Sequence, residues 1–381
     1  MHELLTIHYI DINWLIALQV VLLGFIGGIL SGFIGSGGAF FMTPGMMNLG
    51  VGGVVAVASN ITHKFGKAMV GSRKHAAAGN VDKKLAALML ATAIVGIQIA
   101  VAINSYLFKG AGGGHGAATG AGANLYISLV FAIILSAVAV SMLRDVLSSN
   151  DGEDGEGGPS QKLVEFFSRL NIPPVIHFEV ADTSVSLWVL MAAGIATGYL
   201  AGTIGVGGFI GVPAMIYLFG VPTAVATGTE LFLALFMGAY GALSYAYQGF
   251  VDLRLTMLLY LGSLVGIHLG VYGVKVVKEK YIRGVTSVII LLCVFSRIIA
   301  IPVYLRQLGV ISYDAGWDRY FNGASKFFLF ASGLSGALII IMQIIRAYRQ
   351  RGRIRKTLLL VKNEEPGKGR VAPPVQQQAT G

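Results

Sequence analysis

Cysteine and charge are both scarce in this chain of 381 residues. Cys293 is the one cysteine, which excludes an intramolecular disulfide and any cysteine cluster for zinc or an iron–sulfur centre. Charged residues make up 12% of the sequence, about half of the share that soluble domains usually carry. The sequence contains no HExxH pair and no P-loop, so we expect no metal, no cofactor and no enzymatic activity.

Apolar residues dominate instead. They make up 55% of the chain, and the mean hydropathy is +0.73. Long apolar stretches recur along most of the length, which is typical of an all-α, polytopic protein embedded in the lipid bilayer. The formal net charge of +10 does not indicate a nucleic-acid partner, because the basic residues mostly flank apolar segments and no soluble basic domain is present.

Membrane helices can be predicted from segment length, since a hydrocarbon core of about 30 Å requires roughly 20 apolar residues. The long segments that qualify are 14–34, 53–72, 85–108, 124–147, 187–204, 222–247, 253–276, 282–305 and 324–346. Two further segments, 38–49 and 208–219, are too short to span a bilayer comfortably. The sequence leaves open whether each short segment is part of a re-entrant hairpin or crosses the membrane.

The two short segments belong to an internal repeat with an offset of 170 residues. LSGFIGSGG at 30–38 corresponds to LAGTIGVGG at 200–208, and GNVD at 79–82 corresponds to GFVD at 249–252. One extra residue before Pro44 brings this proline against Pro213. A repeat of this length, with a glycine-rich break inside apolar sequence, is typical of secondary transporters.

The distribution of lysine and arginine predicts the orientation of the chain. Basic clusters follow the second, seventh and last long segments, and we expect all three in the cytoplasm: Arg73, Lys74, Lys83 and Lys84; Lys275, Lys278, Lys280 and Arg283; and six residues from Arg346 to Lys356. The N-terminus then lies outside the inner membrane and the C-terminus inside. Segment 85–108 runs outward and its counterpart 253–276 runs inward, which predicts two inverted repeats.

This topology divides the chain into five regions. We expect a first membrane repeat at 1–147, an acidic cytoplasmic linker at 148–186, and a second, inverted repeat at 187–305. A final membrane helix at 306–350 and a cytoplasmic tail at 351–381 complete the chain.

Each glycine-rich break is a candidate for substrate binding. Backbone that leaves a membrane helix must be buried or line a cavity, and the N–H groups that begin the next helix are unpaired and carry partial positive charge. Two such helix starts would form an anion site without a basic side chain. The alternative is helix packing through small residues. The candidate residues are Gly35, Ser36, Gly37 and Gly38 in the first copy and Gly205, Gly207 and Gly208 in the second.

Polar residues follow each short segment at a depth that could lie near the middle of the membrane. Asn60 and Glu230 occupy equivalent positions, with Lys64 near the first and Thr229 beside the second. Ionisable groups in a membrane are costly and are functional candidates. We expect Asn60, Lys64 and Thr229 to bind substrate and Glu230 to carry a proton. The alternative is an ion pair between Glu230 and Lys64 or Lys67 that only neutralises charge.

A resemblance to a known family lies in GFIGSGGAFFMTP at 32–44, GTIGVGGFIGVP at 202–213, ATGTELF at 226–232, and the two tags ending in Val-Asp, GNVD at 79–82 and GFVD at 249–252. In these motifs the sequence resembles the TauE/SafE sulfite-exporter family. The likeness covers roughly 14–108 and 187–305. It implies a transporter of small sulfur-containing anions, such as sulfite or organosulfonates, that works without ATP. The functional roles that the resemblance implies apply only to the matching glycines and prolines of this chain and to the polar stretch after them.

We therefore expect a secondary transporter that moves a small anion, sulfite or an organosulfonate, by alternating access. Two other classes remain open. The chain could be an uncoupled channel for small anions, or a structural membrane subunit that anchors a partner through its acidic linker and basic tail. Its expected partners are the anionic substrate and the lipid bilayer, and an oligomer or a partner subunit fits the sequence equally well.

Overall fold

The computed structural model describes residues 9–34, 38–110, 120–148, 172–205, 207–274 and 279–364, and nearly all of them are helical. The first half contains α1 (Trp14–Ile34), α2 (Ala39–Asn48), α3 (Gly53–Ala77), α4 (Lys83–Gly110) and α5 (Ala121–Ser148). The second half contains α7 (Leu187–Ile204), α8 (Gly208–Pro213), the π-helical turn η1 (Ala214–Leu218), α9 (Thr223–Tyr247), α10 (Leu253–Val274), α11 (Glu279–Gln307) and α12 (Trp317–Glu364). Each long or short segment predicted from the sequence corresponds to one of these elements, η1 being continuous with α8.

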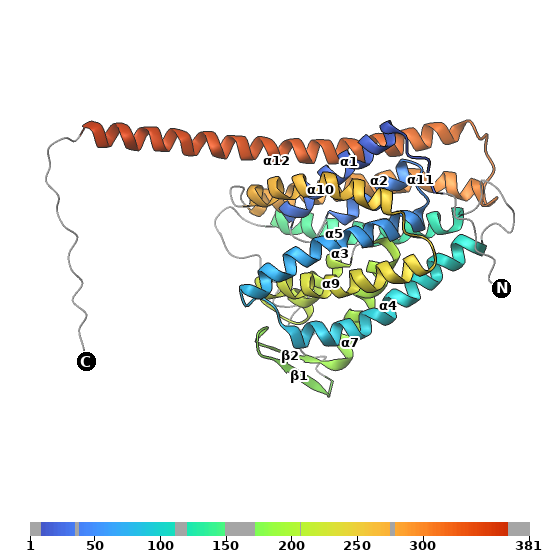
Figure 1. Ribbon diagram of the computed structural model, residues 1–381, viewed down its shortest axis with the longest axis horizontal. Helices are drawn as coiled ribbons and strands as arrows, with labels where there is room; N and C mark the ends of the chain where they lie inside the picture. Colours follow the sequence, from blue (N-terminus) through green and yellow to red (C-terminus); the bar gives the residue numbers. More distant parts are fainter. Residues whose placement is uncertain are drawn as a thin grey trace.

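Eight of the described helices are long and apolar enough to cross a membrane, which confirms an all-α polytopic membrane protein. The long helix outside this set is α3, which carries His63, Lys64 and Lys67 between apolar residues. The final helix differs from the prediction in its bounds, because α12 begins before residue 324 and continues beyond residue 346 to Glu364. In Figure 1 its far end extends well past the bundle of the other helices.

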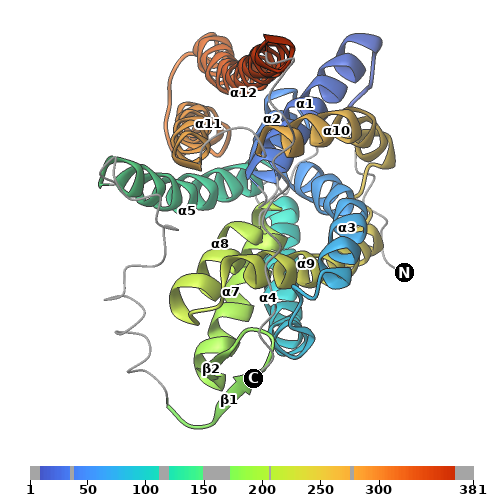
Figure 2. The same cartoon turned by 90° about the vertical axis from the view of Figure 1, so that its left-hand side faces the viewer.

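The helices pair across the two halves of the chain. α1 packs along α10, and α7, which corresponds to α1 under the 170-residue offset, packs along α4, which corresponds to α10. α3 packs on its counterpart α9, and α5 on its counterpart α11. Figure 2 shows α4, α7, α8 and α9 grouped together, with α5, α11 and α12 at another side of the bundle. Neither half could bury its apolar faces in this way alone.

Glycines allow the paired backbones of α1 and α10 to touch. A Cβ added to Gly28 would lie 2.6 Å from the Ser263 carbonyl oxygen, and one added to Gly24 would lie 2.5 Å from the Leu259 carbonyl oxygen. Gly262 and Gly266 make the reciprocal approach from α10. Small residues at helix interfaces are the usual means of close packing in membranes, where van der Waals contact replaces the hydrophobic effect.

Replacing Gly28 by leucine should therefore destabilise the protein. The larger side chain would have to push α10 away from α1, at a cost of about 1–3 kcal/mol or more. We expect a lower melting temperature and a smaller monodisperse peak on size-exclusion chromatography. Gly323→Leu on α12 is the matched control, because a Cβ at Gly323 meets no atom within 4 Å. Equal melting temperatures for the two variants would contradict this account of the interface.

Each long helix before a glycine-rich break forms a hairpin with the short helix after it. The backbone of Gly38 packs against Gly27, and Gly45, farther along α2, packs against Leu23, so α2 runs back along α1. In the second half, a Cβ on Gly207 would lie 2.8 Å from that of Ala201. The short helices thus turn back toward the ends at which α1 and α7 begin. Each pair therefore enters and returns on the same side, as the predicted topology requires.

Part of the predicted linker is a β-hairpin. β1 (Val175–Phe178) and β2 (Thr183–Ser186) pair antiparallel, with Phe178 opposite Thr183, and Asp182 in the turn has a positive φ of 47°. The hairpin contacts the membrane domain, since the Ala181 N–H donates to Asp82 Oδ2 at 3.2 Å and Thr183 Oγ1 donates to the Phe219 carbonyl at 2.5 Å. Residues 149–171 of the predicted acidic linker lie outside the described residues.

The two tags ending in Val-Asp start equivalent helices. Gly79 and Gly249, with φ of 75° and 79°, adopt the left-handed backbone conformation that favours glycine and terminate α3 and α9. The Asp82 N–H donates to Thr229 Oγ1 at 3.0 Å, and the Asp252 N–H donates to Ser59 Oγ at 3.3 Å. Ser59 and Thr229 are themselves 170 residues apart. Each half of the chain therefore holds the start of a long helix in the other half.

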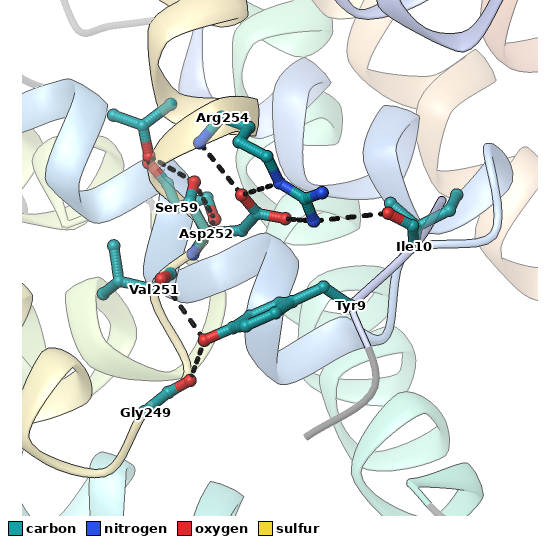
Figure 3. Close-up of polar contacts among 8 residues, drawn as sticks. Tyr9, Ile10, Ser59, Gly249, Val251, Asp252 and Arg254 are labelled. Atoms are coloured by element: carbon teal, nitrogen blue, oxygen red, sulfur yellow. Dashed lines mark hydrogen bonds and ion pairs between the residues drawn. The ribbon is translucent and has the colours of Figure 1, made fainter. Parts of the chain in front are cut away.

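Around Asp252 the chain before α1 adds further contacts (Figure 3). The Tyr9 hydroxyl donates to the Gly249 carbonyl, and Arg254, which forms an ion pair with Asp252 at 2.9 Å, donates from Nη2 to the Ile10 carbonyl at 3.4 Å. Burial and the neighbouring Asp252 carboxylate raise the pKa of Tyr9, so its hydroxyl keeps its proton at neutral pH. These contacts fasten the N-terminal segment to the start of α10.

Candidate functional site

The glycine-rich break in the second half is held by side chains from both halves. Gly205 ends α7 with a left-handed φ of 78°, and its N–H donates to the Ala201 carbonyl at 3.0 Å. The last carbonyls of α7 would otherwise be orphaned in an apolar surrounding. Tyr245 donates to the Gly202 carbonyl at 2.7 Å, and Thr43 donates to the Ile204 carbonyl at 3.1 Å. The C-terminal end of α7 is thus satisfied by the protein itself.

Thr43 and Asn60 bring the first half of the chain onto this break. The Asn60 amide donates to Thr43 Oγ1 at 2.8 Å, and both residues are fully buried. A Cβ on Gly205 would lie 2.9 Å from Asn60 Nδ2 and 3.3 Å from Thr43 Oγ1. Asn60 of α3, a predicted substrate ligand, therefore lies directly beside a predicted glycine. Thr43 was not predicted, although its place immediately before Pro44 in the repeated motif is a signal that could have identified it.

The helix that follows the break begins at Gly208 and is continued by η1. The Ile210 and Gly211 N–H groups both point back to the Gly207 carbonyl at 3.1 Å, so the helical turn starts at Gly207. Pro213 provides no N–H, and the Phe219 N–H reaches back five residues to the Ala214 carbonyl at 3.3 Å. π-helical turns of this kind occur frequently at functional sites.

Glu230 of α9 lies against this helix. Its side chain is 4% exposed, and neither carboxylate oxygen has a hydrogen-bond partner among the described residues. The carboxylate lies against Gly211, where any Cβ would collide with Oε2. The Thr197 methyl group also lies near Gly211, and the Thr197 hydroxyl is buried without a hydrogen-bond partner among the described residues. An unpartnered carboxylate in such a place is costly, which favours a group that accepts and releases a proton.

The basic residues of α3 face the same region, but they do not form the ion pair considered from the sequence. In the described part of the chain no ion pair joins Glu230 to Lys64 or Lys67. Lys67 Nζ instead donates to Ser31 Oγ at 3.1 Å, in the last turn of α1, where a cation is favoured by the helix dipole. Lys64 remains the charged residue that interacts electrostatically with Glu230.

The remaining predicted residues fall in other places. Thr229 is buried, and its hydroxyl accepts the Asp82 N–H, so it belongs to the start of α4 rather than to the break. Gly38 precedes α2 and packs on Gly27. The first break itself, comprising Gly35, Ser36 and Gly37, lies outside the described residues.

A feature that the sequence did not reveal is an interruption of α3 by Tyr260. The Gly66 N–H donates to the Tyr260 hydroxyl at 3.0 Å, and that hydroxyl donates to the Thr62 carbonyl at 3.1 Å. Gly66 and Thr62 are four residues apart and would bond to one another in a regular helix. A side chain inserted in this ladder is a recognised cause of helix bending. The insertion lies between Lys64 and Lys67.

Tyr260→Phe should slow transport without unfolding the protein. Without the hydroxyl, the Gly66 N–H can bond directly to the Thr62 carbonyl, which would shift Lys64 relative to Lys67. The change in stability should be small, about 1 kcal/mol, because one hydrogen bond replaces two. Initial rates of anion uptake by proteoliposomes, measured beside the melting temperature, provide the test. An unchanged rate would show that the interruption has no part in transport.

Comparison with known proteins agrees with this architecture. Residues 20–297 match the family model described as sulfite exporter TauE/SafE. A curated relative from Bacillus subtilis (strain 168), named probable membrane transporter protein YjnA, is 24% identical over 255 residues, which cover 67% of this chain and 89% of that protein. No solved structure matches.

Proposed function

Because the chain belongs to the sulfite exporter TauE/SafE family of membrane transporters, we propose that it is a secondary transporter of a small anion. The proposed substrate is sulfite or an organosulfonate, and the proposed location is the inner membrane, with the N-terminus outside and the C-terminus in the cytoplasm. The observation that carries the proposal is the meeting of Asn60 and Thr43, from the first half, with the Gly205 break of the second.

The anion would bind at this meeting point. The N–H groups at the start of α8 offer partial positive charge, and the satisfied carbonyls of α7 do not compete for them. Asn60 and Lys64 approach from α3, and the glycines allow an oxyanion to come close to the backbone. By the sequence repeat, Gly35, Ser36, Gly37 and Gly38 would supply a second helix start. The bilayer and the apolar neighbours strengthen each of these interactions.

Alternating access would follow from movement of one repeat against the other. The contacts of Thr229 with Asp82 and of Ser59 with Asp252 are related by the 170-residue offset, which supports two repeats that interact reciprocally. The two helical hairpins would then move as units, while these contacts keep α3 and α9 attached to the long helices beside them. Glu230, whose carboxylate has no hydrogen-bond partner among the described residues, would bind a proton in one state and release it in the other.

The decisive experiment is uptake of sulfite by proteoliposomes of the purified protein, with and without an imposed pH gradient. Taurine, sulfoacetate, thiosulfate and sulfate serve as competitors. Saturable uptake that responds to the gradient is the expected result. Uptake that does not saturate and ignores the gradient would indicate an uncoupled anion channel. Absence of flux for every anion would remove the substrate assignment and favour a structural subunit that anchors a partner.

A further inference from the structure

Arg297 of α11 is the largest fully buried side chain in the described part of the protein. It is 1% exposed and belongs to a helix that is otherwise among the most apolar of the chain. No repeated motif of the sequence includes this residue, and no hydrogen bond among the described residues joins it to the break at Gly205. A full positive charge in this position requires an explanation, because charged groups in the membrane interior are rare and costly.

The guanidinium has few partners. Its Nη2 donates to Ser325 Oγ of α12 at 2.9 Å, whereas Nε and Nη1 have no hydrogen-bond partner among the described residues. No described aspartate or glutamate forms an ion pair with it. The ionisable side chains beside it, Cys293 and Tyr304, are neutral when protonated, and the Tyr304 hydroxyl is a further polar neighbour of the guanidinium. The charge is therefore buried without a counter-charge from the protein.

The polar residues around Arg297 do not compensate for this charge. Ser325 Oγ bonds to Asn48 Oδ1 at 3.0 Å, and the Asn48 amide donates to Ser296 Oγ at 3.2 Å. These groups are neutral and are largely committed to one another. The last carbonyls of α2, which end near Asn48, accept the N–H groups of Leu49 and Gly50 rather than the guanidinium.

We propose that Arg297 is the centre of a second anion-binding site, formed between the C-terminal end of α2, α11 and α12. The occupant would be a small inorganic anion such as sulfite, sulfate or chloride. A planar guanidinium with two free N–H-bearing nitrogens can hold an oxyanion through parallel hydrogen bonds, and the anion would neutralise the buried charge. The hydroxyls of Ser296 and Ser325 and the amide of Asn48 lie near the guanidinium, and they could exchange hydrogen bonds with one another for hydrogen bonds to the anion.

This site is separate from the one in the proposed function. Asn48 ends α2 and Gly38 precedes its start, so about 15 Å of helix lies between Gly38 and the Asn48 end that shares Ser325 with Arg297. The inference rests on the buried charge alone and does not depend on the identity of the transported substrate. A phospholipid phosphate has the same chemistry, but the near-complete burial of Arg297 favours a free anion.

Thermal unfolding of the purified protein tests the site directly. Sodium gluconate is replaced by chloride, sulfate or sulfite at constant ionic strength, and the melting temperature is followed as a function of anion concentration. A ligand that binds the folded state raises the melting temperature saturably. We expect such a rise for the wild type and its loss in Arg297→Gln. Gly207→Leu, which alters only the other site, should keep the response that depends on Arg297.

Ser325→Ala provides a second route in case Arg297→Gln does not fold. It leaves the charge and removes the hydroxyl that orients Nη2, so the concentration at half of the maximal rise should increase several-fold. The proposal fails if the wild type shows no anion-dependent rise, or if both variants titrate as the wild type does. It also fails in its free-anion form if only an added anionic phospholipid raises the melting temperature. Loss of flux in Gly207→Leu, with an intact Arg297-dependent rise, would separate the two sites.

Discussion

Gly207→Leu is expected to abolish saturable sulfite uptake while the protein still inserts into the membrane. A Cβ at this position would already lie 2.8 Å from that of Ala201 and 3.3 Å from the Thr197 carbonyl oxygen. A leucine would push the start of α8 away from α7 and fill the space beside the N–H groups that the anion needs. Because the change is confined to one turn of the hairpin, helix pairing elsewhere should survive.

Uptake by proteoliposomes, with protein orientation and amount measured in the same vesicles, checks this prediction. Gly323→Leu again serves as the matched control, since it adds the same side chain where no atom lies within 4 Å. We expect the control to transport at the wild-type rate. If Gly207→Leu retained saturable uptake, the second break would not be the binding site, whatever its effect on stability.

Glu230→Gln should separate transport from the proton gradient. The replacement keeps the size and shape of the side chain but cannot ionise, and it leaves the contact with Gly211 in place. In the wild type, an acid exterior should accelerate inward transport of the anion if Glu230 carries protons in the same direction as the anion. It should slow inward transport if protons and anion move in opposite directions. In the variant the rates with and without the gradient should be equal.

The matched control is Glu179→Gln, because Glu179 lies in the exposed turn of the β-hairpin and outside the helices. It should respond to the pH gradient as the wild type does. A Glu230→Gln protein whose uptake still followed the gradient would exclude this carboxyl group as the coupling site. Loss of uptake both with and without the pH gradient would instead indicate that transport itself requires the negative charge of Glu230, which would balance the positive charge of Lys64.

Much of this protein could be predicted from the sequence because the bilayer is a demanding solvent. Apolar length and hydropathy predicted the approximate place of the described helices, since each span must satisfy its own backbone. The 170-residue repeat, with its glycines and Val-Asp tags, located the breaks and the starts of α4 and α10. The resemblance to the TauE/SafE family rested on the same residues, and the family match bears it out.

Which residues meet was decided only by the tertiary structure. Asn60 and Glu230 are equivalent in sequence, yet one bonds to Thr43 beside Gly205 and the other lies unpartnered against Gly211. Thr229 adjoins Glu230, but one residue along a helix turns the side chain by about 100°, and its hydroxyl serves α4 instead. The insertion of Tyr260 into α3 and the isolation of Arg297 depend on contacts between helices far apart in the chain. Local pattern determines which segments are helices, whereas side-chain contacts follow from how those helices pack.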